Sequence, residues 1–191
     1  GRVWEPGKGV TPADIHKSIW EQKSKKMACI MTACDKRPWR FNVINKLNEC
    51  YENDDEAFVG EIRTGATYGD LDTGDRHFAG YFAKLFDSKI SVDAWGCGGA
   101  RQTGRFWESL ANGCLVMFQP IEPYVWTNTF EDGKDFVIYE NVDDLEDKLN
   151  YYTEHDNEAR EIAERGFQNL VNNHTTKTRT EEFITLCERY L

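Results

Sequence analysis

The 191-residue sequence lacks the features that identify zinc-binding, secreted and membrane-spanning proteins. Its six cysteines form no Cys-x-x-Cys pair, and its four histidines are scattered without the spacing of metal ligands. These patterns argue against a zinc cluster or a disulfide framework and favour a reducing compartment. No apolar run approaches the ~20 residues of a membrane span, and we recognise no secretory signal. We therefore expect a cytoplasmic protein with no bound metal and no membrane span.

Positive charge is also scarce. Lysine and arginine number 23 against 33 aspartates and glutamates, which gives a formal net charge of −10. Because nucleic acids and anionic membranes attract basic surfaces, this balance argues against either as a nonspecific partner. It leaves room for a small, locally basic pocket that takes a phosphorylated ligand. The hydrophobic content of 40% and the length are those of one globular domain.

The chain divides into a lead-in or linker over residues 1–26 and an α/β domain over residues 27–191. The lead-in has Pro and Gly early and then a short helical turn that ends in lysines, whereas the domain alternates short apolar runs with amphipathic segments. We expect strands in five places: 27–34, 57–62, 89–94, 114–118 and 136–139. We expect helices from Pro38, over 77–86, over 105–111 and through most of 145–191. Short strands separated by helices predict a Rossmann-like parallel sheet with flanking helices.

A glycine-rich loop, WGCGGARQTG at 95–104, lies between a predicted strand and a predicted helix. In an open parallel sheet that position is the carboxyl edge, where ligands bind. Its glycines allow close approach of a ligand, the helix N-terminus offers unpaired N–H groups, and its arginines add positive charge. The pattern indicates a phosphate site with these candidate residues: Gly98, Gly99, Arg101, Thr103, Gly104 and Arg105. The alternative is a loop with solvated arginines, because the P-loop and Gly-x-Gly-x-x-Gly patterns are both absent.

A second basic cluster, Lys36, Arg37 and Arg40, follows the first predicted strand and reaches the same edge. Cations at a helix start oppose the helix dipole, and this local cost favours a ligand there. We take Arg40 as the candidate of the three for binding a diphosphate. The alternative is a solvated helix start.

The segment RFWESLANGCLVMF at 105–118 resembles the signature helix and strand of GT-B glycosyltransferases of the glycosyl-transferase group 1 type. The likeness is strongest to the CgeB-like branch, and it extends over residues 81–96 and 130–179. It implies the C-terminal half of a GT-B fold, which binds a nucleotide-diphosphate sugar for transfer to an unknown acceptor. It also implies that the acceptor site, and the general base of an inverting enzyme, belong to an N-terminal domain of the same polypeptide. No cofactor is implied, since the sugar nucleotide is the substrate.

The same resemblance assigns roles to residues of the signature helix. It implies that Glu108 binds the ribose hydroxyls and that Arg105 lies near the diphosphate. The wider family has a second Glu eight positions upstream, where this chain has Ala100, and that departure favours the CgeB-like branch. The alternative for Glu108 is a surface carboxylate paired with Arg105 at i,i+3.

Transfer without a metal ion is a further implication of the resemblance, because basic side chains then stabilise the departing diphosphate. An Asp-x-Asp pair, Asp70-Leu71-Asp72, lies in a Thr- and Gly-rich stretch, and we interpret it as a helix cap rather than a metal grip. Two other functions stay open: a non-catalytic module that binds nucleotide sugars, and an α/β interaction domain whose loop binds nothing.

Overall fold

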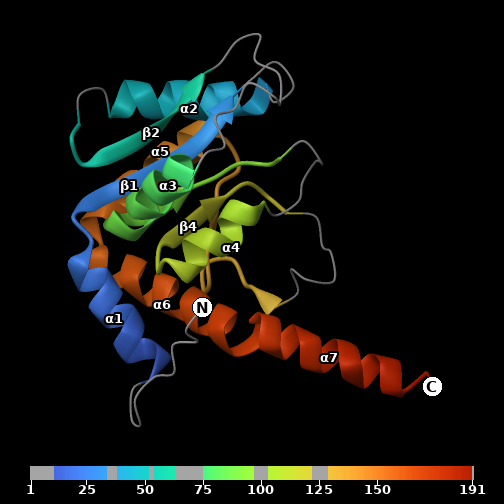
Figure 1. Cartoon of the computed structure of the whole chain (residues 1–191). Helices are drawn as coiled ribbons and strands as arrows, with labels where there is room; N and C mark the ends of the chain where they lie inside the picture. Colours follow the sequence, from blue (N-terminus) through green and yellow to red (C-terminus); the bar gives the residue numbers. More distant parts are fainter. Residues whose placement is uncertain are drawn as a thin grey trace.

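The computed structural model describes residues 11–33, 38–51, 54–62, 75–96, 103–121 and 129–190. Its centre is a parallel sheet of five strands in the order β2-β1-β3-β4-β5. The strands are β1 Lys25–Ala33, β2 Ala57–Ile62, β3 Ser88–Val92, β4 Leu115–Phe118 and β5 Val137–Ile138. The helices are α1 Pro12–Gln22, α2 Pro38–Cys50, α3 Asp75–Asp87, α4 Gly104–Ala111, α5 Val142–Glu154, α6 Asp156–Asn173 and α7 Thr176–Glu188. The predicted α/β architecture is confirmed (Figure 1).

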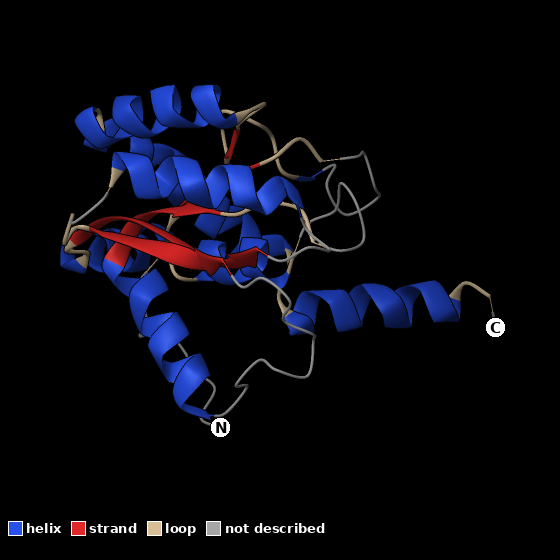
Figure 2. Cartoon of the chain, turned by 90° about the horizontal axis from the view of Figure 1, so that it is seen from above, coloured by secondary structure: helices blue, strands red, loops and turns tan. Residues whose placement is uncertain are grey.

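Helices cover both faces of the sheet, which lies between them in Figure 2. Strand β4 shows why this arrangement suits the sequence, because successive side chains of a strand point to opposite faces. Leu115 and Met117 pack in a core with residues of α2, α5 and α6. Val116 and Phe118 pack on the other face with Phe106 of α4. An unbroken apolar strand is therefore required where both faces are buried.

The strand order fixes where a ligand site is expected. From β1 the chain passes to β2 on one side and then crosses to β3 on the other, so the order reverses between β1 and β3. In open α/β sheets a crevice forms at such a reversal, outside the carboxyl ends of the strands. This edge receives the start of α2, the residues that follow β3 and the start of α4.

The second half of the expected lead-in forms helix α1. Thr11 caps the helix, and its side chain and that of Asp14 form a reciprocal capping box. His16 and Trp20, four residues apart and hence on one helix face, are buried against α6. The Trp20 indole N–H donates to Asp156 at the start of α6 over 3.4 Å. Trp20, which shares a helix face with His16, thus attaches α1 to the body of the domain.

Several element boundaries differ from those expected. Strand β3 ends at Val92 rather than Ala94. The side chain of the next residue, Asp93, accepts hydrogen bonds from Thr103 and Arg105 at the start of α4. Strand β5 comprises two residues, Val137–Ile138, instead of four. Helix α7 has no buried residue, and both views show it extending away from the body of the domain (Figures 1 and 2). Among the described helices, none combines the length and apolar character needed to cross a bilayer.

Candidate functional site

Helix α4 begins at the carboxyl edge of the sheet, directly after Thr103. Thr103 is the N-cap residue, but its side chain makes no capping hydrogen bond to the helix backbone. Its hydroxyl donates instead to Oδ2 of Asp93, the residue that follows β3. The N–H groups of the first turn are therefore left without the side-chain acceptor that a threonine N-cap normally provides.

Asp93 also fixes the guanidinium of Arg105, in the first turn of α4. The Arg105 Nε–H donates to Oδ1 of Asp93 over 3.0 Å, and the aspartate side chain is 1% exposed against 24% for the arginine. Burial is the largest single influence on the pKa of Arg105 and lowers it. The charge and the hydrogen bond of Asp93, together with smaller effects of Tyr81 and Cys29, nevertheless leave the pKa raised. The terminal amino groups of Arg105 make no hydrogen bond to any residue that the structure describes. A fixed cation, whose two terminal amino groups have no partner in the described part of the chain, therefore lies at the helix start.

Glu108 lies one turn further along α4. Its Oε2 accepts a hydrogen bond of 2.5 Å from the hydroxyl of Tyr81 in α3. Burial and the nearby Glu108 carboxylate both raise the pKa of Tyr81, so the phenol stays a donor. Oε1 accepts no hydrogen bond from a described residue and lies 3.7 Å from the position of a Cβ on Gly104. Within the described ranges, Oε1 is therefore an acceptor without a donor, near the first turn of the same helix.

The alternative pairing of Glu108 with Arg105 is absent: in the described part of the chain each has another partner. Arg105 pairs with Asp93, and Glu108 pairs with Tyr81. Residues three apart lie on one helix face, so the Arg105 guanidinium and the Glu108 carboxylate share that face without an ion pair between them.

Arg40 is almost fully buried at the same edge, with 1% exposure. Its Nη2–H donates to the carbonyl of Ala94 and its Nε–H to the carbonyl of Trp95, both over 3.0 Å. The Trp39 indole donates to the same Trp95 carbonyl over 3.0 Å. Helix α2 is thereby fastened to the chain that leaves β3, across the reversal in strand order. These contacts give Arg40 a supporting position, and the diphosphate contact expected of it stays a prediction.

The structure brings four predicted site residues together: Thr103, Gly104, Arg105 and Glu108. The other predicted residues of the glycine-rich loop, Gly98, Gly99 and Arg101, lie outside the described residues, as do Lys36, Arg37, Asp70 and Asp72. Sequence reasoning missed Asp93 and Tyr81. An acidic residue directly after the apolar strand at the carboxyl edge was a usable signal for Asp93. Nothing local identifies Tyr81, which belongs to α3 and meets Glu108 only in the fold.

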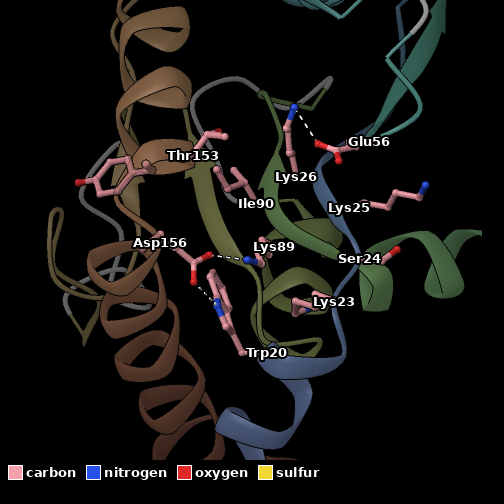
Figure 3. A pocket seen from close by; sticks show the side chains of 12 residues that line it. Trp20, Lys23, Ser24, Lys25, Lys26, Glu56, Lys89, Ile90, Thr153 and Asp156 are labelled. Atoms are coloured by element: carbon pink, nitrogen blue, oxygen red, sulfur yellow. Dashed lines mark hydrogen bonds and ion pairs between the residues drawn. The ribbon is translucent and has the colours of Figure 1, made fainter.

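A hollow of about 270 Å³ lies at the opposite, amino edge of the sheet (Figure 3). Two of its four lysines pair with carboxylates, Lys89 with Asp156 over 2.5 Å and Lys26 with Glu56 over 2.7 Å. The other two, Lys23 and Lys25, donate to backbone carbonyls. The lysines that line the hollow thus outnumber its carboxylates, but it lies away from the reversal in strand order, where ligands bind in sheets of this kind. Across the described ranges, no group of three or more His, Cys, Asp or Glu side chains is arranged to hold a metal ion.

Comparison with known proteins gives one family and several similar folds. The model of the family described as glycosyl transferase-like matches residues 80–185, which is more than half of the chain and includes Tyr81, Asp93, Arg105 and Glu108. None of the curated proteins matches this chain significantly.

Three solved structures share the fold. The C-terminal domain of the glycosyl transferase group 1 family protein LpcC from Francisella tularensis superimposes with a TM-score of 0.56 at 14% identity, over 84% of this chain and 93% of that one. TarM superimposes with a TM-score of 0.53 at 16% identity, over 86% of this chain and 35% of its own. A variant of S. aureus TarM in complex with Fondaparinux, alpha-GlcNAc-glycerol and UDP gives a TM-score of 0.57 at 15% identity, over 86% of this chain and 36% of its own. This chain therefore has the fold of a GT-B C-terminal domain and spans about a third of the TarM chains.

Proposed function

We propose, from the premise that this chain belongs to the glycosyl transferase-like family, that it binds a nucleotide-diphosphate sugar at the carboxyl edge of its sheet and serves sugar transfer. The family membership supports a transferase. The LpcC and TarM folds support the assignment to the donor-binding half of a GT-B site.

The observation that carries the proposal is the arrangement of α4. Arg105 is held through Nε on the buried Asp93, and its terminal amino groups have no partner among the described residues. One turn along, Glu108 keeps Oε1 without a donor while Tyr81 occupies Oε2. A guanidinium and a helix N-terminus suit a diphosphate. A carboxylate oxygen suits a sugar hydroxyl, which donates to it. A nucleoside diphosphate presents both groups.

The same arrangement gives the domain a part in the chemistry. When the bond between the sugar and the diphosphate breaks, negative charge develops on the departing nucleotide. We place the Arg105 guanidinium and the first-turn N–H groups of α4 against that charge, where preorganised donors stabilise the transition state. We assign Glu108 to the ribose, where hydrogen bonds from the ribose hydroxyls to its carboxylate fix the position of the nucleotide. The Gly98, Gly99, Arg101 and Arg40 contacts expected from the sequence are part of this proposal.

The acceptor and the general base are proposed to come from another domain of a longer polypeptide. This chain spans 35% and 36% of the two TarM chains, and a GT-B cleft lies between two Rossmann-like halves. The other half of such a cleft would also exclude water from the reacting sugar.

Calorimetry with a panel of UDP-, GDP- and dTDP-sugars tests the proposal. UDP compounds come first, because UDP is bound in the S. aureus TarM variant complex. We expect micromolar binding by at least one member of the panel and unchanged affinity in excess EDTA, because the cations at the site are side chains. A strict need for Mn²⁺ would contradict the metal-independent mechanism.

The panel also separates the remaining alternatives. Absence of any binder in the panel would favour an interaction domain. A protein that binds a sugar nucleotide, but whose longest natural polypeptide transfers no sugar to any acceptor, would be a non-catalytic module.

A further inference from the structure

We propose that Asp93 is a positioning residue, which directs the Arg105 guanidinium and the start of α4 toward the diphosphate of the ligand. The inference rests on the proposed function and extends it to a residue that the ligand does not touch. Asp93 has 0% exposure, so a bound nucleotide meets Arg105 and not the aspartate.

Both carboxylate oxygens of Asp93 are used, and each acts on α4. Oδ1 accepts from the Arg105 Nε–H over 3.0 Å, and Oδ2 accepts from the Thr103 hydroxyl. A charged group this deeply buried is tolerated only when it is paired and hydrogen-bonded. One carboxylate thus fixes both the N-cap residue, Thr103, and the first-turn residue Arg105.

The backbone of Asp93 is itself held in place by hydrogen bonds. The Asp93 backbone N–H donates to the carbonyl of Met117 in β4 over 3.0 Å. Its carbonyl accepts from the buried Tyr139 hydroxyl over 2.8 Å. The next two carbonyls, of Ala94 and Trp95, are held by Arg40. The carboxylate is thereby anchored to the sheet on one side and to α2 on the other.

The consequences for a ligand follow from which atoms are used. A guanidinium bound through Nε presents both terminal amino groups outward in one plane, which is the geometry for a bidentate contact with phosphate. The Thr103 hydroxyl is turned toward Asp93 and makes no capping hydrogen bond to the helix. The Phe106 N–H donates to the Thr103 carbonyl. The N–H groups of Gly104 and Arg105 have no acceptor among the described residues, so they are open to a ligand. One buried carboxylate thus prepares two kinds of donor for the same anion.

Substitution Asp93→Asn, which keeps the shape and removes the charge, tests this role. Affinities for UDP are measured by calorimetry and those for uridine by competition, with the tightest nucleoside diphosphate of the panel and its nucleoside replacing them if UDP is not the best. We expect UDP binding to weaken by about 10- to 100-fold, the effect of losing one well-placed charge-assisted contact, while uridine binding changes less than about twofold.

Two further variants keep the test decisive. In an Arg105→Gln background, Asp93→Asn should weaken UDP binding by only about 3- to 10-fold more, because the part of its effect that acts through Arg105 is already lost and the part that acts through Thr103 remains. Thr103→Val keeps the charges of Asp93 and Arg105. It replaces Asp93→Asn as the test if circular dichroism shows that the Asp93→Asn protein is unfolded. We expect Thr103→Val to weaken UDP binding about 3- to 10-fold at unchanged uridine affinity.

The outcomes distinguish the two proposals. If the wild-type chain binds UDP and uridine, and a folded variant retains UDP affinity or loses uridine affinity in proportion, the positioning role is overturned and the proposed function stands. If the wild-type chain binds no nucleotide of the panel, the proposed function is overturned, and the positioning role with it.

Discussion

Substitution Glu108→Ala is expected to weaken UDP binding by about 30- to 1000-fold while the domain stays folded. The estimate corresponds to about 2–4 kcal/mol for two charge-assisted hydrogen bonds from the ribose hydroxyls. The side chain is partly exposed on α4, and its one hydrogen bond to a described residue is with Tyr81, so its removal leaves the core intact. Calorimetry measures the affinity, and circular dichroism measures the fold.

A ligand series makes the assignment of Glu108 to the ribose specific. The wild-type chain should prefer UDP over 2′-deoxy-UDP, and the Glu108→Ala variant should lose most of that preference. Glu161→Ala on the exposed face of α6 is the matched control and should bind like the wild type. An unchanged UDP affinity in a folded Glu108→Ala protein would exclude the residue from the site.

Substitution Gly166→Ala is expected to destabilise the domain by about 2–4 kcal/mol, the cost of overpacking a buried contact. A Cβ at this position in α6 would lie 2.2 Å from the carbonyl oxygen of Asp135 and 2.8 Å from Leu110 Cδ2. The first of these is backbone and cannot rotate away, so α6 must move. The clash should outweigh the ~1 kcal/mol that alanine ordinarily gains over glycine in a helix. Urea unfolding at equilibrium measures the loss.

Gly80 provides a control of opposite sign for Gly166→Ala. It is also a helical glycine, in α3, but it is exposed and nothing lies within 4 Å of its added Cβ. Gly80→Ala should therefore stabilise the domain by about 0.5–1 kcal/mol. Equal effects of the two substitutions would contradict the close packing of α6 against the chain before β5.

The elements that the sequence predicted best are those whose apolar pattern lies within the element itself. Strand β4 is an uninterrupted apolar run, and its burial on both faces follows from that run. Helix α4 was expected over 105–111, and its residues Phe106 and Leu110, four apart, are both buried. Helix α1 was underestimated, because its stability depends on Trp20 packing against α6, which lies more than a hundred residues away in the sequence.

The candidate site was predicted in part, because only some of its residues lie close together in the sequence. The glycine pattern and the resemblance indicated α4, Arg105 and Glu108, which are close together in the chain. The partners that orient these two side chains, Asp93 and Tyr81, come from other elements. The diphosphate contact of Arg40 stays a prediction. Nothing in the sequence indicated the carbonyls that receive its N–H groups, those of Ala94 and Trp95 after β3, because only the fold brings them to Arg40.

The most direct test of the central claim is an NMR titration of the ¹⁵N-tryptophan-labelled chain with UDP. Trp39 and Trp95 lie at the carboxyl edge beside the start of the glycine-rich loop, whereas Trp20 lines the hollow at the amino edge. Their indole signals are assigned with single Trp→Phe variants. The account predicts that UDP shifts the Trp39 and Trp95 signals and leaves the Trp20 signal unchanged. A saturable shift of Trp20, with Trp39 and Trp95 unaffected, would place the nucleotide at the wrong edge of the sheet and contradict the account.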